Sequence, residues 1–93
     1  MSRVVRFRVE YCDPYLGYTL DSWLREVRDI LEDEYAVKIL VEEPRRRLSC
    51  GELDPKLYME DELILEGLPG EEGYLIEVLK HHLDRLLGLK DHQ

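Results

Sequence analysis

Cys12 is followed directly by Asp13, Pro14 and Tyr15, and it ends a stretch in which apolar and charged residues alternate. A cysteine thiolate is a nucleophile that attacks disulfides, and a nearby helix N-terminus stabilises it through free N–H groups that carry partial positive charge. A helical pattern begins a few residues after Cys12. This spacing indicates thiol chemistry at a strand-to-helix junction, although Asp13 adds an adjacent negative charge that disfavours the thiolate.

The position three residues after Cys12 is Tyr15, where a dithiol motif would place its second cysteine. With a single thiol at this motif, the remaining reaction is monothiol exchange, in which Cys12 forms a mixed disulfide that an external thiol such as glutathione resolves. The only other cysteine of the chain is Cys50. The alternative for both cysteines is that they are small, buried apolar residues without chemistry.

The elements that position Cys12 can be predicted from the periodicity of the apolar residues. Residues 5–11 alternate as a half-buried strand does. Thr19 is the expected N-cap of a helix that continues to about Glu34. A second alternating strand is expected over residues 36–43, and residues 44–54 form a polar loop.

Pro55 opens the second half of the chain, at the start of a third strand over residues 56–60. Together with residues 62–66 this strand is expected to form a hairpin. A last helix is expected from about residue 71 or 74 to residue 87, with Gly88 as its stop and residues 89–93 as a loose tail.

This order predicts one α/β domain over residues 1–93, with elements in the order β-α-β-β-β-α. Two strands joined by a helix are parallel and a hairpin is antiparallel, so the four-stranded sheet is mixed. Alternation in every strand indicates that both helices cover the same face of the sheet.

The uncovered face of that sheet is expected to be mainly charged. Its interpretation is a solvated surface with cross-strand ion pairs, and the alternative is a homodimer or partner surface that uses its few apolar side chains. The residues expected on this face are Arg6, Arg8, Glu10, Lys38, Leu40, Glu42, Tyr58, Glu62, Ile64 and Glu66.

The element order, with a cysteine after the first strand and a proline opening the third, resembles the thioredoxin-like fold. Within that fold the chain is most similar to the small selenoprotein W-related group, with the second motif cysteine replaced by Tyr15. The residues that carry the resemblance are Tyr11-Cys12-Asp13-Pro14-Tyr15, Gly17-Tyr18, the helix around Trp23 and Leu24, Leu63 and Gly73-Tyr74.

The resemblance implies a thiol–disulfide oxidoreductase that acts on protein thiols or glutathione, with Cys12 as the nucleophile and no cofactor beyond glutathione as co-substrate. It implies that Pro55 is a cis-proline and that Pro14, Tyr15 and Pro55 shape a substrate groove. In the related fold the segment before this proline passes close to the first cysteine. Cys50 would then be able to pair with Cys12, as a redox partner or as a staple. The alternative function is a non-catalytic protein-binding module on the same scaffold.

Composition excludes several other functions. A net charge of −8 opposes general affinity for nucleic acid or for an anionic membrane, and Arg45-Arg46-Arg47 is expected to form local ion pairs. Two cysteines are too few for a four-ligand zinc site, and His81 and His82 are adjacent on a helix, so no metal site is expected.

The chain has no apolar run of membrane-spanning length and no signal-like apolar core near Met1, so a cytoplasmic protein is expected. Many Glu, Arg and Leu residues, with one Gln and no Asn, are typical of thermophile proteins.

Overall fold

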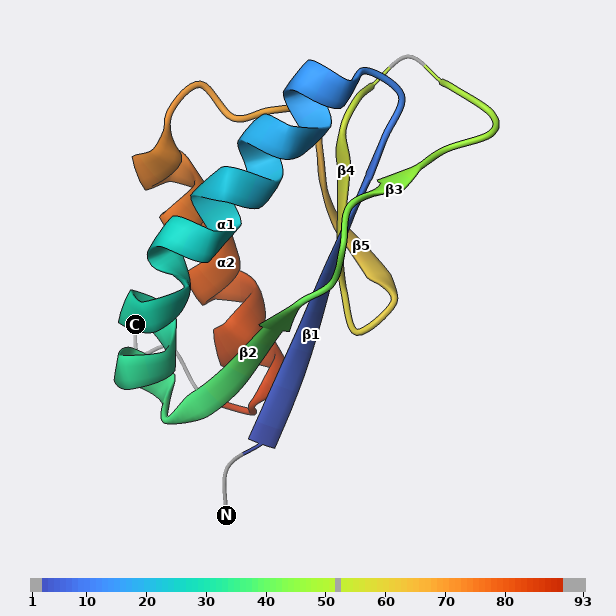
Figure 1. Cartoon of the computed structure of the whole chain (residues 1–93). Coiled ribbons are helices and arrows are strands. Elements are labelled where there is room, and N and C mark those ends of the chain that lie inside the picture. The colour runs from blue at the N-terminus through green and yellow to red at the C-terminus, as the bar shows by residue number, and fades with distance from the viewer. Residues whose placement is uncertain (1–2, 52, 90–93) are drawn as a thin grey trace.

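Five strands and two helices make up the structure, a computed structural model that describes residues 3–51 and 53–89 (Figure 1). In chain order they are β1 (Arg3–Tyr11), α1 (Pro14–Tyr35), β2 (Val37–Val41), β3 (Arg45–Arg46), β4 (Lys56–Met59), β5 (Glu62–Glu66) and α2 (Glu72–Leu86).

The sheet is mixed, as the sequence predicts, and β1 lies at its centre. The strand order is β2-β1-β4-β5, in which β1 runs parallel to β2 and antiparallel to β4. Strands β4 and β5 form the predicted antiparallel hairpin.

The expected count of four strands was wrong, because β3 pairs in parallel with the last two residues of β1. Both residues of β3 are exposed arginines, so no alternation of apolar and polar side chains marks them as a strand. The backbone holds β3 in place, and just beyond it the Arg47 N–H donates to the carbonyl of Tyr11 at 2.8 Å.

The hydrophobic core lies between one face of the sheet and the two helices, which Figure 1 shows on the same side of β1. Alternate residues of β1 point into this core, as the burial pattern of that strand shows. Over the described residues, neither helix has the length and apolar composition needed to cross a membrane. The core residues are Val5, Phe7, Val9, Leu20, Leu24, Val27, Leu31, Val37, Ile39, Val41, Leu57, Met59, Leu75, Leu79 and Leu83.

Helix α1 begins five residues before the predicted N-cap at Thr19, so that prediction was wrong. Asp13 caps the helix by accepting the Tyr15 N–H on Oδ1 at 2.9 Å. Pro14 follows at the first helical position, where a missing N–H costs nothing. Thr19 lies inside the helix, and its hydroxyl donates to the Tyr15 carbonyl at 2.7 Å.

The uncovered face differs from the prediction along β5, because a register shift separates Leu57 from Tyr58 in the β4–β5 pair. Tyr58 pairs with Leu63, which therefore lies on the open face in place of Ile64. An extra residue in one strand reverses the alternation beyond it. Ile64 packs against the core instead.

Glu62 also leaves the open face, since it pairs with the buried Met59 and so projects to the helix side. There it accepts from Arg85 of α2 at 3.1 Å. On the open face, Arg8 bonds Glu10 and Asp61 and lies 4.5 Å from the centre of the Tyr58 ring. The Arg8–Glu10 pair lies within β1 and Asp61 lies in the β4–β5 turn, whereas Lys56–Glu66 is an ion pair across two strands of the expected kind. A homodimer through this face stays a prediction.

The close packing of α1 on the end of β1 depends on Gly17. A Cβ atom at this position would overlap the Cβ, Cγ and Cδ2 atoms of Tyr11. Tyr11 is buried, and its backbone is paired with Arg46 of β3. The ring therefore has little room to move.

We expect Gly17→Ala to lower the free energy of unfolding by about 1–3 kcal/mol, because the added methyl group overpacks this contact. Urea unfolding followed by circular dichroism measures the change. The matched control is Gly73→Ala in α2, where a Cβ would meet nothing within 4 Å. This control should be neutral or stabilising by up to about 1 kcal/mol, and a Gly17→Ala protein of equal stability would contradict the tight contact.

Candidate functional site

The two cysteines form a disulfide, Cys12–Cys50, with their Cα atoms 5.9 Å apart and 38 positions apart in sequence. Cys12 is half-buried between the end of β1 and the start of α1, whereas Cys50 is exposed in the loop between β3 and β4. The structure therefore contains the pairing that the sequence left open. The alternative of two unpaired, buried cysteines was wrong.

A second link between the same two segments comes from Asp54. Its Oδ1 accepts the Cys12 N–H at 2.9 Å, and its Oδ2 accepts the Asp13 N–H at 2.7 Å. The next residue, Pro55, is buried and joined to Asp54 by a cis peptide bond, in agreement with the expectation for this proline. No local pattern indicates the role of Asp54, since an aspartate before a proline is also common at an ordinary strand start.

Two carboxylates therefore occupy the N–H groups around Cys12. Asp54 accepts from residues 12 and 13, and the Asp13 side chain accepts from Tyr15. Free N–H groups at a helix start stabilise an anion, but here they are already bonded to negative charges. A thiolate on Cys12 consequently receives little help from the helix.

Cys50 lies in a different electrostatic setting. Residues 44–50 contain three arginines and no carboxylate. The expectation of local ion pairs for Arg45, Arg46 and Arg47 was wrong within residues 3–51 and 53–89, where none of the three lies within ion-pair distance of a carboxylate. In that part of the chain the buried Nη1 of Arg47 also has no hydrogen-bond acceptor.

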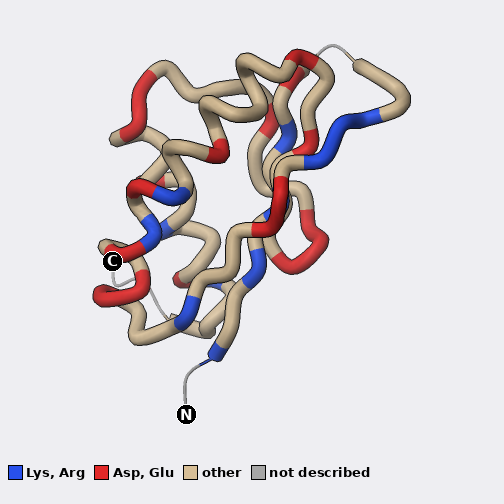
Figure 2. Tube along the Cα trace, in the orientation of Figure 1, with Lys and Arg blue, Asp and Glu red and all other residues tan. Residues whose placement is uncertain are grey.

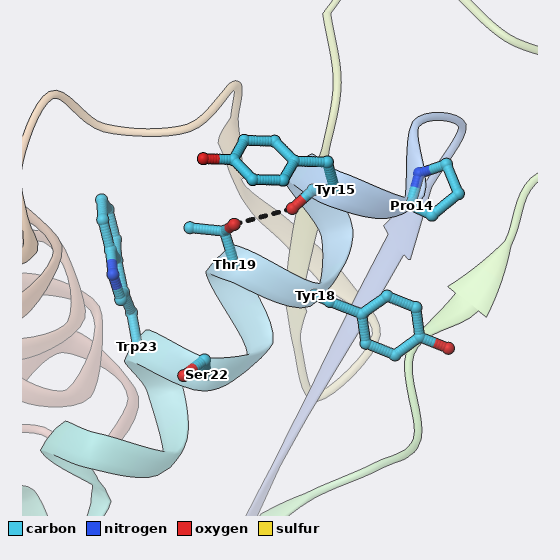
Figure 3. A pocket seen from close by; sticks show the side chains of 6 residues that line it. All are labelled: Pro14, Tyr15, Tyr18, Thr19, Ser22 and Trp23. Atoms are coloured by element: carbon cyan, nitrogen blue, oxygen red, sulfur yellow. Dashed lines mark hydrogen bonds between the residues drawn. The ribbon is translucent and has the colours of Figure 1, made fainter.

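A groove of about 460 Å³ runs along the exposed side of α1, beginning two residues after Cys12 (Figure 3). Figure 3 shows Tyr15 and Trp23 on the same side of the helix, with Thr19 between them. Tyr18 points the other way, and its ring centre lies 5.5 Å from that of Tyr11. The residues that line the groove are Pro14, Tyr15, Tyr18, Thr19, Ser22 and Trp23.

The structure thus brings together some of the predicted site residues and separates others. Cys12 and Cys50 are bonded, and Pro14 and Tyr15 line a groove that starts beside them. Pro55 is buried and does not line this groove. Sequence reasoning missed Asp54 as part of the site. It favoured Trp23 as a core residue over one of an aromatic rim beside Cys12, and the structure shows Trp23 partly buried against the core and also lining the groove.

No protein-family model, curated protein or solved structure matches this chain at a significant level. The function is therefore argued from the geometry of the disulfide and its surroundings.

We expect Asp54→Ala to lower the free energy of unfolding of the oxidised protein by about 1–3 kcal/mol, because two backbone N–H groups lose a charged acceptor. Urea titration checks this. Asp33→Ala, at an exposed position of α1, is the matched control and should change stability by less than about 0.5 kcal/mol. Equal effects of the two substitutions would show that the Asp54 bonds contribute nothing specific.

Proposed function

We propose that this protein is a small thioredoxin-like redox protein whose Cys12–Cys50 disulfide exchanges with thiols of proteins or of glutathione. The observation that carries the proposal is the disulfide at the β1–α1 junction, with one half-buried and one exposed cysteine. A disulfide is open to exchange when an outside thiolate can reach one of its sulfurs.

Three features support the thioredoxin-like scaffold. The order of the main elements is strand, helix, strand, hairpin and helix, and both helices lie on one face of a mixed sheet (Figure 1). A cysteine follows the first strand, and a proline next to the residue that bonds it precedes β4. The short strand β3 and the cysteine at position 50 are additions to the pattern that the selenoprotein W-related group suggested.

The proposed reaction is a two-step transfer of two electrons. A thiolate attacks one sulfur of the disulfide, a new S–S bond forms, and the electron pair of the broken bond goes to the other cysteine, which takes up a proton. A second thiolate then attacks the outer sulfur of the mixed disulfide and releases the protein cysteine. Two thiols are oxidised to one disulfide, and Cys12–Cys50 is reduced to two thiols.

Access favours Cys50 as the sulfur that is attacked. Cys50 is exposed and Cys12 is half-buried. The Asp13 and Asp54 carboxylates lie beside Cys12 and repel an anionic thiolate that approaches from that side. Cys50 is then the residue that forms the mixed disulfide, and Cys12 is the thiol that resolves it in the reverse direction. This reverses the role of nucleophile that the resemblance implied for Cys12.

The proposal includes the cytoplasmic location expected from the sequence. A reducing compartment supplies glutathione as the second thiol, and the electrons come from the thiols themselves.

We expect reduced glutathione to form an adduct on Cys50 of the folded, oxidised protein. The reaction is quenched with N-ethylmaleimide, and mass spectrometry identifies which cysteine carries glutathione. The Cys12→Ser and Cys50→Ser proteins give the matched comparison with oxidised glutathione, and the protein that retains Cys50 should react about tenfold faster because its thiol is accessible.

A disulfide that resists glutathione until urea unfolds the chain would contradict the redox proposal. The bond would then be a staple that closes a long loop, and the non-catalytic binding module would be the function to test. Faster reaction at Cys12 than at Cys50 would instead contradict only the roles assigned to the two cysteines.

A further inference from the structure

The exposed charges on the open face of the sheet are separated by sign. On the half of this face formed by β1, β2 and β3, the exposed charged residues are all basic: Arg6, Lys38 and Arg45. On the half formed by β4, β5 and their turn, they are all acidic: Glu60, Asp61 and Glu66. Figure 2 shows the basic run of β3 and the acidic turn between β4 and β5 on separate parts of the trace. The open face thus has a basic half and an acidic half.

The strand register places these charges in matching rows. The Glu60 N–H donates to the Arg6 carbonyl at 3.0 Å, so these two residues lie in one row across β1 and β4. Another row runs across β3, β1, β4 and β5, and it begins with Arg45 and ends with Glu66. Each row therefore has an exposed cation on one side of the boundary between β1 and β4 and an exposed anion on the other side.

The charges near the centre of the face are already paired within the chain. The side chains of Arg8, Glu10 and Lys56 are only 18%, 19% and 14% exposed, and each has an ion-pair partner. Arg6 and Arg45, in contrast, have no carboxylate within ion-pair distance among residues 3–51 and 53–89. These two exposed cations are therefore the groups of the basic half that another molecule can pair.

A face with this pattern is complementary to itself. Rotation by 180° about an axis that runs along the strands, between β1 and β4, exchanges the basic half with the acidic half. When two copies face each other across this axis, Arg6 of one copy lies opposite Glu60 of the other, and Arg45 lies opposite Glu66. The strands of the two sheets then run in nearly the same direction, as in aligned sheet packing.

The net charge of the open face also favours a second copy. The strands and the hairpin turn on this face carry five basic and five acidic residues, whereas the whole chain has a net charge of −8. The excess negative charge lies elsewhere, so two copies that meet through this face avoid most of their mutual repulsion. The ten residues are Arg6, Arg8, Lys38, Arg45, Lys56, Glu10, Glu42, Glu60, Asp61 and Glu66.

We propose that two copies of this chain form a symmetric dimer through their open sheet faces, with the basic half of each copy against the acidic half of the other. Leu40 and Leu63 are exposed on opposite halves, two rows apart. In the dimer, Leu40 of one copy and Leu63 of the other lie about 7 Å apart along the strands and add an apolar contact. The dimer does not depend on thiol exchange at the disulfide.

The size of the face predicts a weak dimer. Four strands about 4.8 Å apart and about 20 Å long give a flat area of about 400 Å² per copy. Stable complexes bury about 800 Å² per partner, so we expect a dissociation constant in the micromolar range or above. Because the contact depends on exposed charges, added salt weakens it.

The first experiment measures association of the unaltered, oxidised protein. Sedimentation equilibrium from about 5 to about 200 µM should show a monomer–dimer equilibrium at low salt and less dimer at high salt. A non-reducing gel confirms that no intermolecular disulfide contributes. The amide chemical shifts that change on dilution should belong to the strands and not to the helices, which locates the interface without any substitution.

The second experiment reverses one charge on the interface. Arg45→Glu should weaken the dimer at least about tenfold, since two attractive ion pairs become repulsive. The matched control is Arg46→Glu, which makes the same change of charge at the next residue. Arg46 pairs with the buried Tyr11 and so projects to the helix side of the sheet. This control should therefore change the affinity less than about threefold.

The third experiment tests the symmetry of the contact by mixing two variants. Glu66→Arg should weaken its own dimer as Arg45→Glu does, although Glu66 also bonds Lys56 of its own chain. In a mixed dimer of the Arg45→Glu and Glu66→Arg proteins, both pairs again join opposite charges. The mixture should therefore associate at least about tenfold more tightly than either variant alone.

Several results would overturn the dimer. They are a protein that stays monomeric over the whole concentration range at low salt, equal losses in Arg45→Glu and Arg46→Glu, no gain on mixing, and dilution shifts confined to α1 or α2. If the substituted proteins do not fold, the dilution shifts of the unaltered protein still decide between the two sides of the sheet. A disulfide that resists glutathione would contradict the redox function and leave the dimer standing.

Discussion

The carboxylate of Asp54 is the contact on which the arrangement of the site depends. It accepts hydrogen bonds from the backbone N–H groups of both Cys12 and Asp13. These two residues follow the end of β1, and Asp13 is the N-cap of α1. Pro55 follows it into β4, which pairs with β1. The Asp54 bonds and the disulfide thus link the loop before β4 to the β1–α1 junction twice, once by hydrogen bonds and once covalently. The first link needs no oxidant.

The same carboxylate gives the two cysteines different surroundings. The N–H groups near Cys12 are bonded to Asp54 and Asp13, whereas Cys50 follows a run of arginines. Because like charges repel, a thiolate that approaches from the Cys12 side meets these two carboxylates. The unequal exposure of the two residues acts in the same direction. The proposal of exchange through Cys50 therefore rests mainly on its greater exposure.

Local patterns in the sequence predicted most of the elements. Alternation located β1, β2 and the β4–β5 hairpin, and helical spacing located most of α1 and α2. Gly88 ends the last helix region with a positive φ of 73°, as expected for a glycine stop. The errors have particular causes. Asp13, and not Thr19, is the N-cap of α1, because Pro14 fits the first helical position. Strand β3 was not predicted because both of its residues are exposed arginines, without alternating apolar residues. The register shift in the hairpin places Glu62 and Ile64 off the open face. The alternation of apolar and polar residues does not reveal a shift of one residue, so the sequence could not predict it.

By itself, the sequence determined the element types, the mixed sheet and the place of Cys12 after the first strand, because each of these follows from the periodicity of neighbouring residues. Only the tertiary structure decided that Cys50 reaches Cys12, that Asp54 holds the N–H groups of the junction and that Arg46 lies beside Tyr11. These contacts join residues that are about 35 to 42 positions apart, and such pairs are set by how the sheet and loops pack rather than by local spacing. Propensity and periodicity describe a residue's neighbours in the chain, and the site is made of neighbours in space.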